Sequence, residues 1–254
     1  MTNRPSGAEH YWTRGGEHFA LRPGPAGNPI LHREYDAVAA RVTEDGNTDV
    51  LDWGCGVGYV AEFMRDRGLH VSLYDFDPAA DGVEERSLPN FESMVAKFSA
   101  DPVRLPYADA SFDAVLSLGT LEHVQFPEHS LAEIRRVLRP GGFFYCYKLP
   151  NRFSYVEYTA KRRGRNYHGA QPHDRLYSLF SARQMVAKSG FDVLDARYRN
   201  MLPARAASKL LPERSHGAAR KVSDVLSRIP LVQLVATNVE VIGRKKEGLT
   251  EPLQ

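Results

Sequence analysis

The 254-residue sequence has little cysteine, no long apolar run and almost no net charge. Its two cysteines, Cys55 and Cys146, form no spaced framework for disulfides, which indicates a reduced, cytoplasmic setting. No apolar segment approaches the ~18 residues that a membrane span needs, and the polar residues 1–7 lack the apolar centre of a secretory signal. A net charge of +2 is too small to indicate a nucleic-acid partner. The expected protein is soluble and touches a membrane at most on its surface.

The most informative segment is the glycine turn in residues 50–60, VLDWGCGVGYV. A short apolar run ends in Asp52, and three glycines then alternate before an amphipathic stretch: Gly54, Gly56 and Gly58. This order predicts a parallel strand, a tight turn and a helix N-terminus, where backbone can approach a nucleotide-like ligand. The dinucleotide pattern G-x-G-x-x-G would place its third glycine at Tyr59, so a dehydrogenase is disfavoured.

Apolar and amphipathic stretches alternate along most of the chain, which predicts an α/β fold with a parallel, doubly wound, Rossmann-like sheet of seven strands. The strands are expected at 49–53, 70–74, 93–98, 112–118, 143–149, 191–199 and 231–242. The helices are expected at 29–42, 58–67, 127–138 and 181–189, with a short, irregular helix after Pro78.

Three segments lie outside this alternation. Residues 1–43 are expected to form an N-terminal lid and a helix, because aromatic residues precede a Pro/Gly hinge at 22–27. The domain proper then spans 44–254, with inserts at about 151–175 and 203–230. The first insert carries a basic cluster: Lys161, Arg162, Arg163 and Arg165. This cluster is compatible with an anionic acceptor or with peripheral contact to anionic lipid headgroups, although solvated surface charge is the simpler interpretation.

Four blocks, in order and spacing, resemble the motifs of class I S-adenosylmethionine-dependent methyltransferases. They are the glycine turn, Val71–Asp75, Ala100–Val115, and Leu121–Val124 with Leu138–Gly142. The resemblance covers residues 48–149 and implies S-adenosylmethionine as the cofactor. It also implies that the two last strands form an antiparallel hairpin. Insertions are expected after the fifth and the sixth strand.

Asp75 ends the second strand about 20 residues past the glycine turn, where a carboxylate can bind ribose hydroxyls. A helix-capping role is the alternative, and position favours Asp75 for ribose and Asp77 for capping. The resemblance implies that Asp101 accepts a hydrogen bond from the adenine amino group. The full set of expected cofactor contacts is Arg33, Asp52, Gly54, Gly56, Gly58, Asp75, Phe76, Asp101, Pro102 and Leu118.

A narrower resemblance links the chain to the ubiquinone-pathway O-methyltransferases. It rests on Trp12, Phe19, Leu21, Asn28-Pro29, the block at 121–124, and His173-Asp174. In that group an arginine just after the Asn-Pro pair contacts the methionine carboxylate of the cofactor. Arg33 is the nearest match but is displaced by two residues, so a surface arginine remains the alternative.

His123 follows a strand tip and is the candidate general base, since imidazole can take a proton from a hydroxyl near neutral pH. Glu122, His123 and His173 could instead bind Mg²⁺. Adjacent residues of an extended strand point to opposite sides, which favours the metal-free base. Aromatic and histidine side chains outside the sheet are expected to line the acceptor pocket: Tyr11, Trp12, His18, Tyr155, Tyr158 and His173.

The sequence therefore predicts methyl transfer from S-adenosylmethionine to a hydroxyl of a small molecule, such as a phenol, quinone precursor, sugar or lipid-linked intermediate. N-methylation of a small amine is the close alternative. From another class, the chain could be a nucleic-acid methyltransferase or a noncatalytic cofactor-binding module. Residues 118–121, Leu-Gly-Thr-Leu, stand where nucleic-acid amino-methyltransferases carry N-P-P-[YF], and no extended basic stripe is present.

Overall fold

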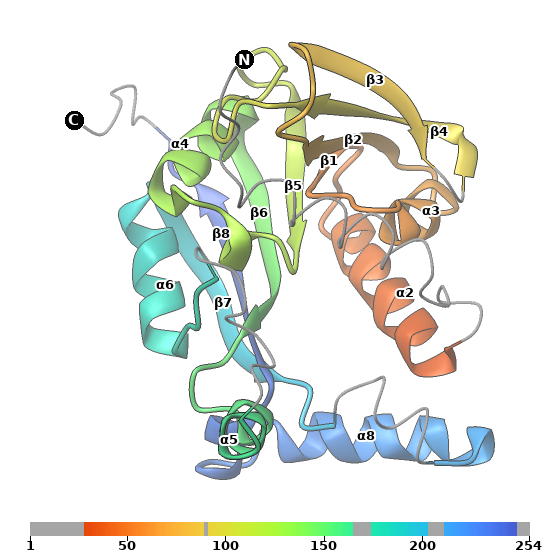
Figure 1. The fold of residues 1–254 in the computed structure, drawn as a ribbon, viewed down its shortest axis with the longest axis vertical. Helices are drawn as coiled ribbons and strands as arrows, with labels where there is room; N and C mark the ends of the chain where they lie inside the picture. The colour runs from red at the N-terminus through yellow and green to blue at the C-terminus, as the bar shows by residue number, and fades with distance from the viewer. Residues whose placement is uncertain (1–27, 89–90, 165–173, 203–210, 248–254) are drawn as a thin grey trace.

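A computed structural model describes residues 28–88, 91–164, 174–202 and 211–247. Its eight strands, whose bounds follow, form one sheet in the order β3-β4-β2-β1-β5-β6-β8-β7 (Figure 1). The strands are β1 Asp49–Trp53, β2 His70–Phe76, β3 Val83–Leu88, β4 Phe91–Ser99, β5 Phe112–Leu118, β6 Leu138–Pro150, β7 Phe191–Arg199 and β8 Asn238–Lys245. The helices are α2 Pro29–Glu44, α3 Tyr59–Arg65, α4 Pro127–Val137, α5 Tyr155–Arg162, α6 Leu179–Lys188 and α8 His216–Leu226, with 3₁₀ turns η2 Leu121–His123, η3 Glu213–Ser215 and η4 Val232–Val235.

The strand directions confirm the predicted doubly wound sheet. β4, β2, β1, β5 and β6 pair in parallel, and β8 is antiparallel to both β6 and β7. Because β8 lies between two strands that run the other way, the carboxyl ends of β6 and β7 lie at the same edge as the start of β8. This carboxyl edge is where open α/β sheets bind their ligands.

Two expected elements are wrong. Residues 83–88 form β3, an eighth strand antiparallel to β4, where an irregular helix was expected. Arg86 fixes this strand locally, because its guanidinium lies 2.6 Å from Asp77 and 2.6 Å from Glu84. The last strand starts at Asn238 instead of residue 231, because the preceding residues turn as η4. The Asn151 side chain holds that turn by donating to the carbonyls of Leu234 and Ala236, each at 2.8 Å.

Helices cover both faces of the sheet (Figure 1). On one face, Val38 and Val42 of α2 and Met64 of α3 pack in one cluster with Leu73 and Leu116 of the sheet. On the other face, α4 and α6 pack against a second cluster that includes Leu51, Val115 and Phe144 of the sheet. Successive residues of a buried parallel strand point to opposite faces, so both sets are apolar.

The two predicted inserts contribute α5 and α8, which lie together at the lower end of the molecule in Figure 1. α5 follows β6 directly, and α8 contacts α2. Both helices therefore lie toward the carboxyl edge of the sheet. Within the described ranges, no helix is both long enough and apolar enough to span a bilayer.

Candidate functional site

The glycine turn is shaped by left-handed backbone. Gly54, Gly56 and Gly58 have φ angles of 76°, 54° and 81°, which favour glycine. The N–H groups of Gly54 and Cys55 both donate to the Tyr74 carbonyl, at 2.9 and 3.0 Å, and so tie the turn to β2. A Cβ on Gly54 would lie only 2.2 Å from the Thr120 side chain, so the turn packs tightly on the exit of β5. Gly56, in contrast, has open space where a Cβ would stand.

Asp75 closes the turn from the tip of β2. Its Oδ2 accepts from the Gly56 N–H at 2.7 Å and its Oδ1 from the Phe76 N–H at 2.8 Å. Burial raises the pKa of Asp75 to about 6, although these two hydrogen bonds oppose the rise. The neighbouring Asp77 accepts from the Ala79 N–H at 2.8 Å in a turn that leads into β3, so it closes a turn and does not cap the helix that was expected there. Asp75 is therefore the carboxylate that faces the glycine turn.

Asp52 lies beneath the turn and is almost fully buried. Burial, followed by the charge of Asp75, raises the pKa of Asp52 to about 8. Its Oδ2 is buried without a hydrogen-bond partner among the described residues. A buried acceptor left unpaired is costly and marks a place where a ligand or water donates. The orphaned oxygen, the open side of Gly56 and the Asp75 carboxylate fit a ligand that carries hydroxyl and ammonium groups.

Asp101 stands at the end of β4, the strand next to β2. Its Oδ1 accepts from the N–H groups of Val103 and Arg104, at 2.9 and 2.8 Å, which fixes the turn before Leu105. Its exposed side chain lies at the carboxyl edge, as does that of Asp75. The edge therefore presents carboxylates from three neighbouring strands, β1, β2 and β4.

A second group of acidic and basic side chains gathers at η2, directly after β5. His123 Nδ1 lies 2.7 Å from Asp174 Oδ1, and His123 Nε2 lies 3.8 Å from Glu122 Oε1. Arg175 fixes the turn, since its N–H donates to the Glu122 carbonyl at 2.9 Å and its guanidinium to the carbonyls of Val124 and Gln125. The prediction that Glu122 and His123 point to opposite sides is wrong, because both lie in a 3₁₀ turn and not in a strand.

The surroundings of this cluster shift the pKa values of both Glu122 and His123. Burial is the main reason why the pKa of Glu122 rises to about 7, and the charge of His123 opposes the rise. Burial alone would lower the pKa of His123, but the hydrogen bond that it donates to Asp174 and the charges of Glu122 and Asp174 outweigh burial and raise that pKa. Glu122 Oε2 is buried with no hydrogen-bond partner among the described residues. Neighbouring groups whose pKa values are both shifted by their surroundings are common in catalytic sites.

The structure does not support the alternative in which Glu122, His123 and His173 bind a metal ion. Within the part of the chain that is described, no group of three or more His, Cys, Asp or Glu side chains could hold an ion. His173, the third expected ligand, lies outside the described residues.

Lys148 is a feature of the site that sequence reasoning missed. A bulge in β6 puts it in the left-handed region, at φ 63°, and turns its side chain toward α2. Its Nζ lies 3.4 Å from Glu34 Oε2 and 4.6 Å from the centre of the Tyr35 ring. Asn200, at the end of β7, donates to the other Glu34 oxygen at 3.0 Å. A lysine inside the apolar run YCYKLP was the one available signal in the sequence.

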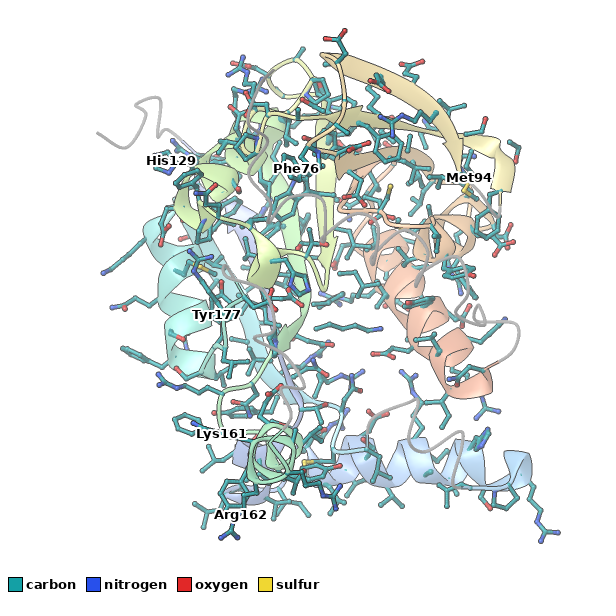
Figure 2. The ribbon with its side chains drawn as sticks, viewed as in Figure 1. Phe76, Met94, His129, Lys161, Arg162 and Tyr177 are labelled. Atoms are coloured by element: carbon teal, nitrogen blue, oxygen red, sulfur yellow. The ribbon has the colours of Figure 1, made fainter. Side chains whose placement is uncertain are left out.

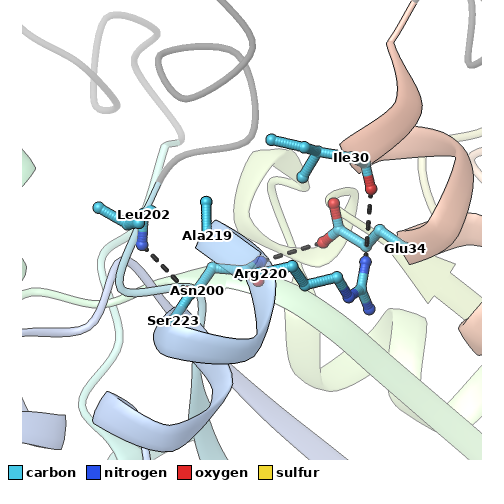
Figure 3. A pocket seen from close by; sticks show the side chains of 7 residues that line it. All are labelled: Ile30, Glu34, Asn200, Leu202, Ala219, Arg220 and Ser223. Carbon is cyan, nitrogen blue, oxygen red and sulfur yellow. Dashed lines mark hydrogen bonds between the residues drawn. The ribbon is translucent and has the colours of Figure 1, made fainter. Parts of the chain in front are cut away.

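These contacts border a pocket between α2 and α8, shown in Figure 3. Its lining residues are Ile30, Glu34, Asn200, Leu202, Ala219, Arg220 and Ser223. Arg220 donates to the Ile30 carbonyl at 3.4 Å, and the Leu202 N–H donates to Ser223 at 3.1 Å. Polar contacts from α8 and the sheet therefore hold the first turn of α2 beside the carboxyl edge.

The other predicted site residues lie in several places. Arg33 is exposed, and its guanidinium lies where a Cβ on Gly217 of α8 would stand. Arg33 takes part in none of the contacts described above for the glycine turn. The Tyr155 hydroxyl donates to the Met201 carbonyl at 2.8 Å, whereas Tyr158 is exposed beneath Arg162. Figure 2 labels Lys161 and Arg162 on α5. Residues predicted for the lid, pocket and basic cluster that lie outside the described residues are Tyr11, Trp12, His18, Arg165 and His173.

Comparison with known proteins agrees with this geometry. The methyltransferase domain family matches residues 51–146. A demethylmenaquinone methyltransferase of Renibacterium salmoninarum is 31% identical over 169 residues, covering 60% of this chain and 69% of the relative. A probable S-adenosylmethionine-dependent methyltransferase of Mycolicibacterium smegmatis is 29% identical over 174 residues, covering 68% of this chain and 63% of the relative.

The matches do not extend over whole relatives. The chain spans 48% of the methyltransferase GfsG of Streptomyces halstedii and 50% of a sterol 24-C-methyltransferase of Eremothecium gossypii. Among solved structures, the 1,6-didemethyltoxoflavin-N1-methyltransferase of Burkholderia thailandensis shares the fold, with a TM-score of 0.53 at 16% identity, covering 97% of this chain and 94% of the other. The glycine turn, the carboxylates at the strand ends and these relatives agree, and the chain belongs to the class I S-adenosylmethionine-dependent methyltransferases.

Proposed function

We propose that this chain methylates a hydroxyl of a small molecule, such as a phenol, quinone precursor, sugar or lipid-linked intermediate. The observation that carries the proposal is the pair His123–Asp174, a histidine whose Nδ1 is held at 2.7 Å by a buried carboxylate. That contact favours the tautomer in which Nδ1 carries the proton, so Nε2 is the ring nitrogen that can accept one. A hydroxyl must lose its proton on methylation, and a base held in this way meets that need.

The cofactor residues of the proposal are those at the carboxyl edge. Asp75 would accept hydrogen bonds from the ribose hydroxyls, Asp101 from the adenine amino group, and Asp52 would face the cationic part of the ligand. When bound, S-adenosylmethionine supplies a methyl group on a positively charged sulfur. The work of the protein is then to hold the acceptor oxygen in line and to remove its proton at His123 Nε2.

The acceptor class is tested by release of S-adenosylhomocysteine from matched acceptors. Catechol and other phenols should support turnover, and mass spectrometry of the product should show a methyl ether. Amines of the same size and shape should react more slowly. N-methylated products formed faster than any ether would contradict the proposal in favour of the amine alternative. No turnover with any acceptor, despite cofactor binding, would favour the noncatalytic module.

Asp174→Asn tests the positioning role of Asp174. The variant should lower kcat by about 10–10²-fold, because it weakens the contact that orients the imidazole. It should also lower the pKa of His123, so the acid limb of the pH–kcat profile should move to lower pH. Asp195→Asn, at a partly exposed carboxylate of β7, is the control and should leave kcat and the profile unchanged. A loss of activity with no movement of the acid limb would reduce Asp174 to a structural role.

A further inference from the structure

α8 packs with its polar face inward. His216 and Ser223 in the helix and Ser227 at its C-cap are 4%, 5% and 4% exposed. Asp224 also points inward, since its Oδ1 lies 3.0 Å from Arg199 Nη1. The outward stripe is apolar: Ala218, Val222, Val225 and Ile229, spaced by four, three and four residues. Val222 and Val225 are 52% and 60% exposed. An amphipathic helix of a globular protein normally buries its apolar stripe, so this stripe lacks a partner among the described residues.

Further exposed apolar side chains follow α8 along the chain and lie on and beside α5. Leu231 and Leu234, beyond α8, are 79% and 41% exposed, and Phe153 before α5 and Tyr158 within it are 57% and 60% exposed. The hydrogen bonds of Asn151, four residues before α5, to residues 234 and 236 tie the chain that leads into α5 to η4, so these segments lie at the same end of the molecule. The exposed surface of residues 152–163 and 218–235 is called the α5–α8 face, and it forms the lower end of the molecule in Figures 1 and 2.

The charge on the α5–α8 face is positive. Its exposed cations include Lys161, Arg162, Arg163, Lys221 and Arg228. α8 contains one acid, Asp224, which turns inward, and α5 contains one, Glu157. A second copy docked on this face would bring like charges together, which is unfavourable. Apolar side chains bordered by Lys and Arg are the combination by which interfacial helices bind anionic bilayers, with the apolar groups below the headgroups and the cations at phosphate level.

We propose that the α5–α8 face docks the protein onto a bilayer that contains anionic lipids. The face lies at the carboxyl edge of the sheet, since α5 follows the end of β6 and α8 packs beside Asn200 and α2. Docking therefore turns the end of the molecule that holds His123 and Lys148 toward the lipid. The interaction requires neither cofactor nor acceptor, so it can hold or fail independently of the proposed O-methylation.

Sedimentation of the full chain with vesicles tests the proposal. The protein should bind phosphatidylcholine vesicles that contain 30% phosphatidylglycerol at low salt, bind pure phosphatidylcholine far less, and dissociate as salt is raised. Val222→Ser with Val225→Ser should weaken binding about tenfold. Lys161→Gln with Arg162→Gln should weaken it about fivefold for each charge removed. Hydrogen exchange over residues 216–235 should slow when the anionic vesicles are added.

Matched controls lie on other surfaces. Val83→Ser with Val95→Ser removes two valines of similar exposure, 54% and 49%, from β3 and β4. Arg183→Gln with Lys188→Gln removes two exposed cations from α6. Neither control should change vesicle binding. The proposal is overturned if the anionic vesicles do not bind, if the α8 variant binds as well as the wild type, if exchange in 216–235 is the same with and without vesicles, or if the α8 variant changes the oligomeric state instead.

Discussion

Replacing His123 with alanine should lower turnover by about 10²–10⁴-fold while affinity for S-adenosylhomocysteine stays nearly unchanged. In the proposed mechanism the imidazole of the η2 cluster takes the acceptor proton, and the carboxylates proposed to bind the cofactor belong to other strands. Turnover is measured with the best phenolic acceptor, and affinity by calorimetry. The loss should be largest with weakly acidic hydroxyls, which depend most on a base.

Two further variants keep this result interpretable. His123→Asn retains a group that can donate to the buried Asp174 but cannot act as a base, so it should fold and be as inactive as His123→Ala. His129→Ala, at an exposed histidine of α4 that Figure 2 labels, should be fully active. Full activity in His123→Ala would refute the base. If EDTA abolishes wild-type activity and Mg²⁺ restores it, the cluster instead binds a metal together with residues outside those described.

Asp75→Ala should weaken binding of S-adenosylhomocysteine by about 1–3 kcal/mol, or about 5–150-fold, since hydrogen bonds to a charged group are lost. The Asp75 carboxylate is the one that contacts the glycine turn, through Gly56. Calorimetry should detect no binding of NAD to either protein. Asp81→Ala, at an exposed carboxylate farther along the same loop, should bind as the wild type does. Unchanged affinity in Asp75→Ala, or tight binding of NAD, would refute this assignment.

The pKa of Asp75 adds a pH dependence to the same measurement. Because burial raises that pKa to about 6, the group is ionised at pH 7.5 and largely protonated at pH 5. A protonated carboxyl accepts hydroxyl hydrogen bonds less well. Affinity should therefore fall as the pH drops through 6, and Asp75→Asn should show a flatter profile over the same range. A parallel fall in both proteins would point to a different titrating group.

Local sequence by itself determined the glycine turn and the strand-tip carboxylate that are proposed to bind the cofactor. The glycines of the turn, the apolar run of β1 and the acid at the tip of β2 follow one another within 30 residues, and short-range patterns of this kind set strand, turn and helix start directly. Each glycine is required by its own left-handed backbone angle, so the motif could be recognised without knowledge of the rest of the chain.

Only the tertiary structure decided the η2 cluster, which is the proposed acceptor side of the site, and the α5–α8 face. Asp174 reaches His123 from 51 residues away, and Glu122 turns beside it because β5 ends in a 3₁₀ turn that Arg175 holds. β3 exists because β4 offers it an edge, and Lys148 faces α2 because a bulge interrupts β6. α8 has an ordinary amphipathic pattern, and which of its faces is buried depends on the polar partners that α2 and β7 present. Contacts between segments that are distant in the sequence require long loops to close. They produce no periodic pattern of residues from which they could be predicted.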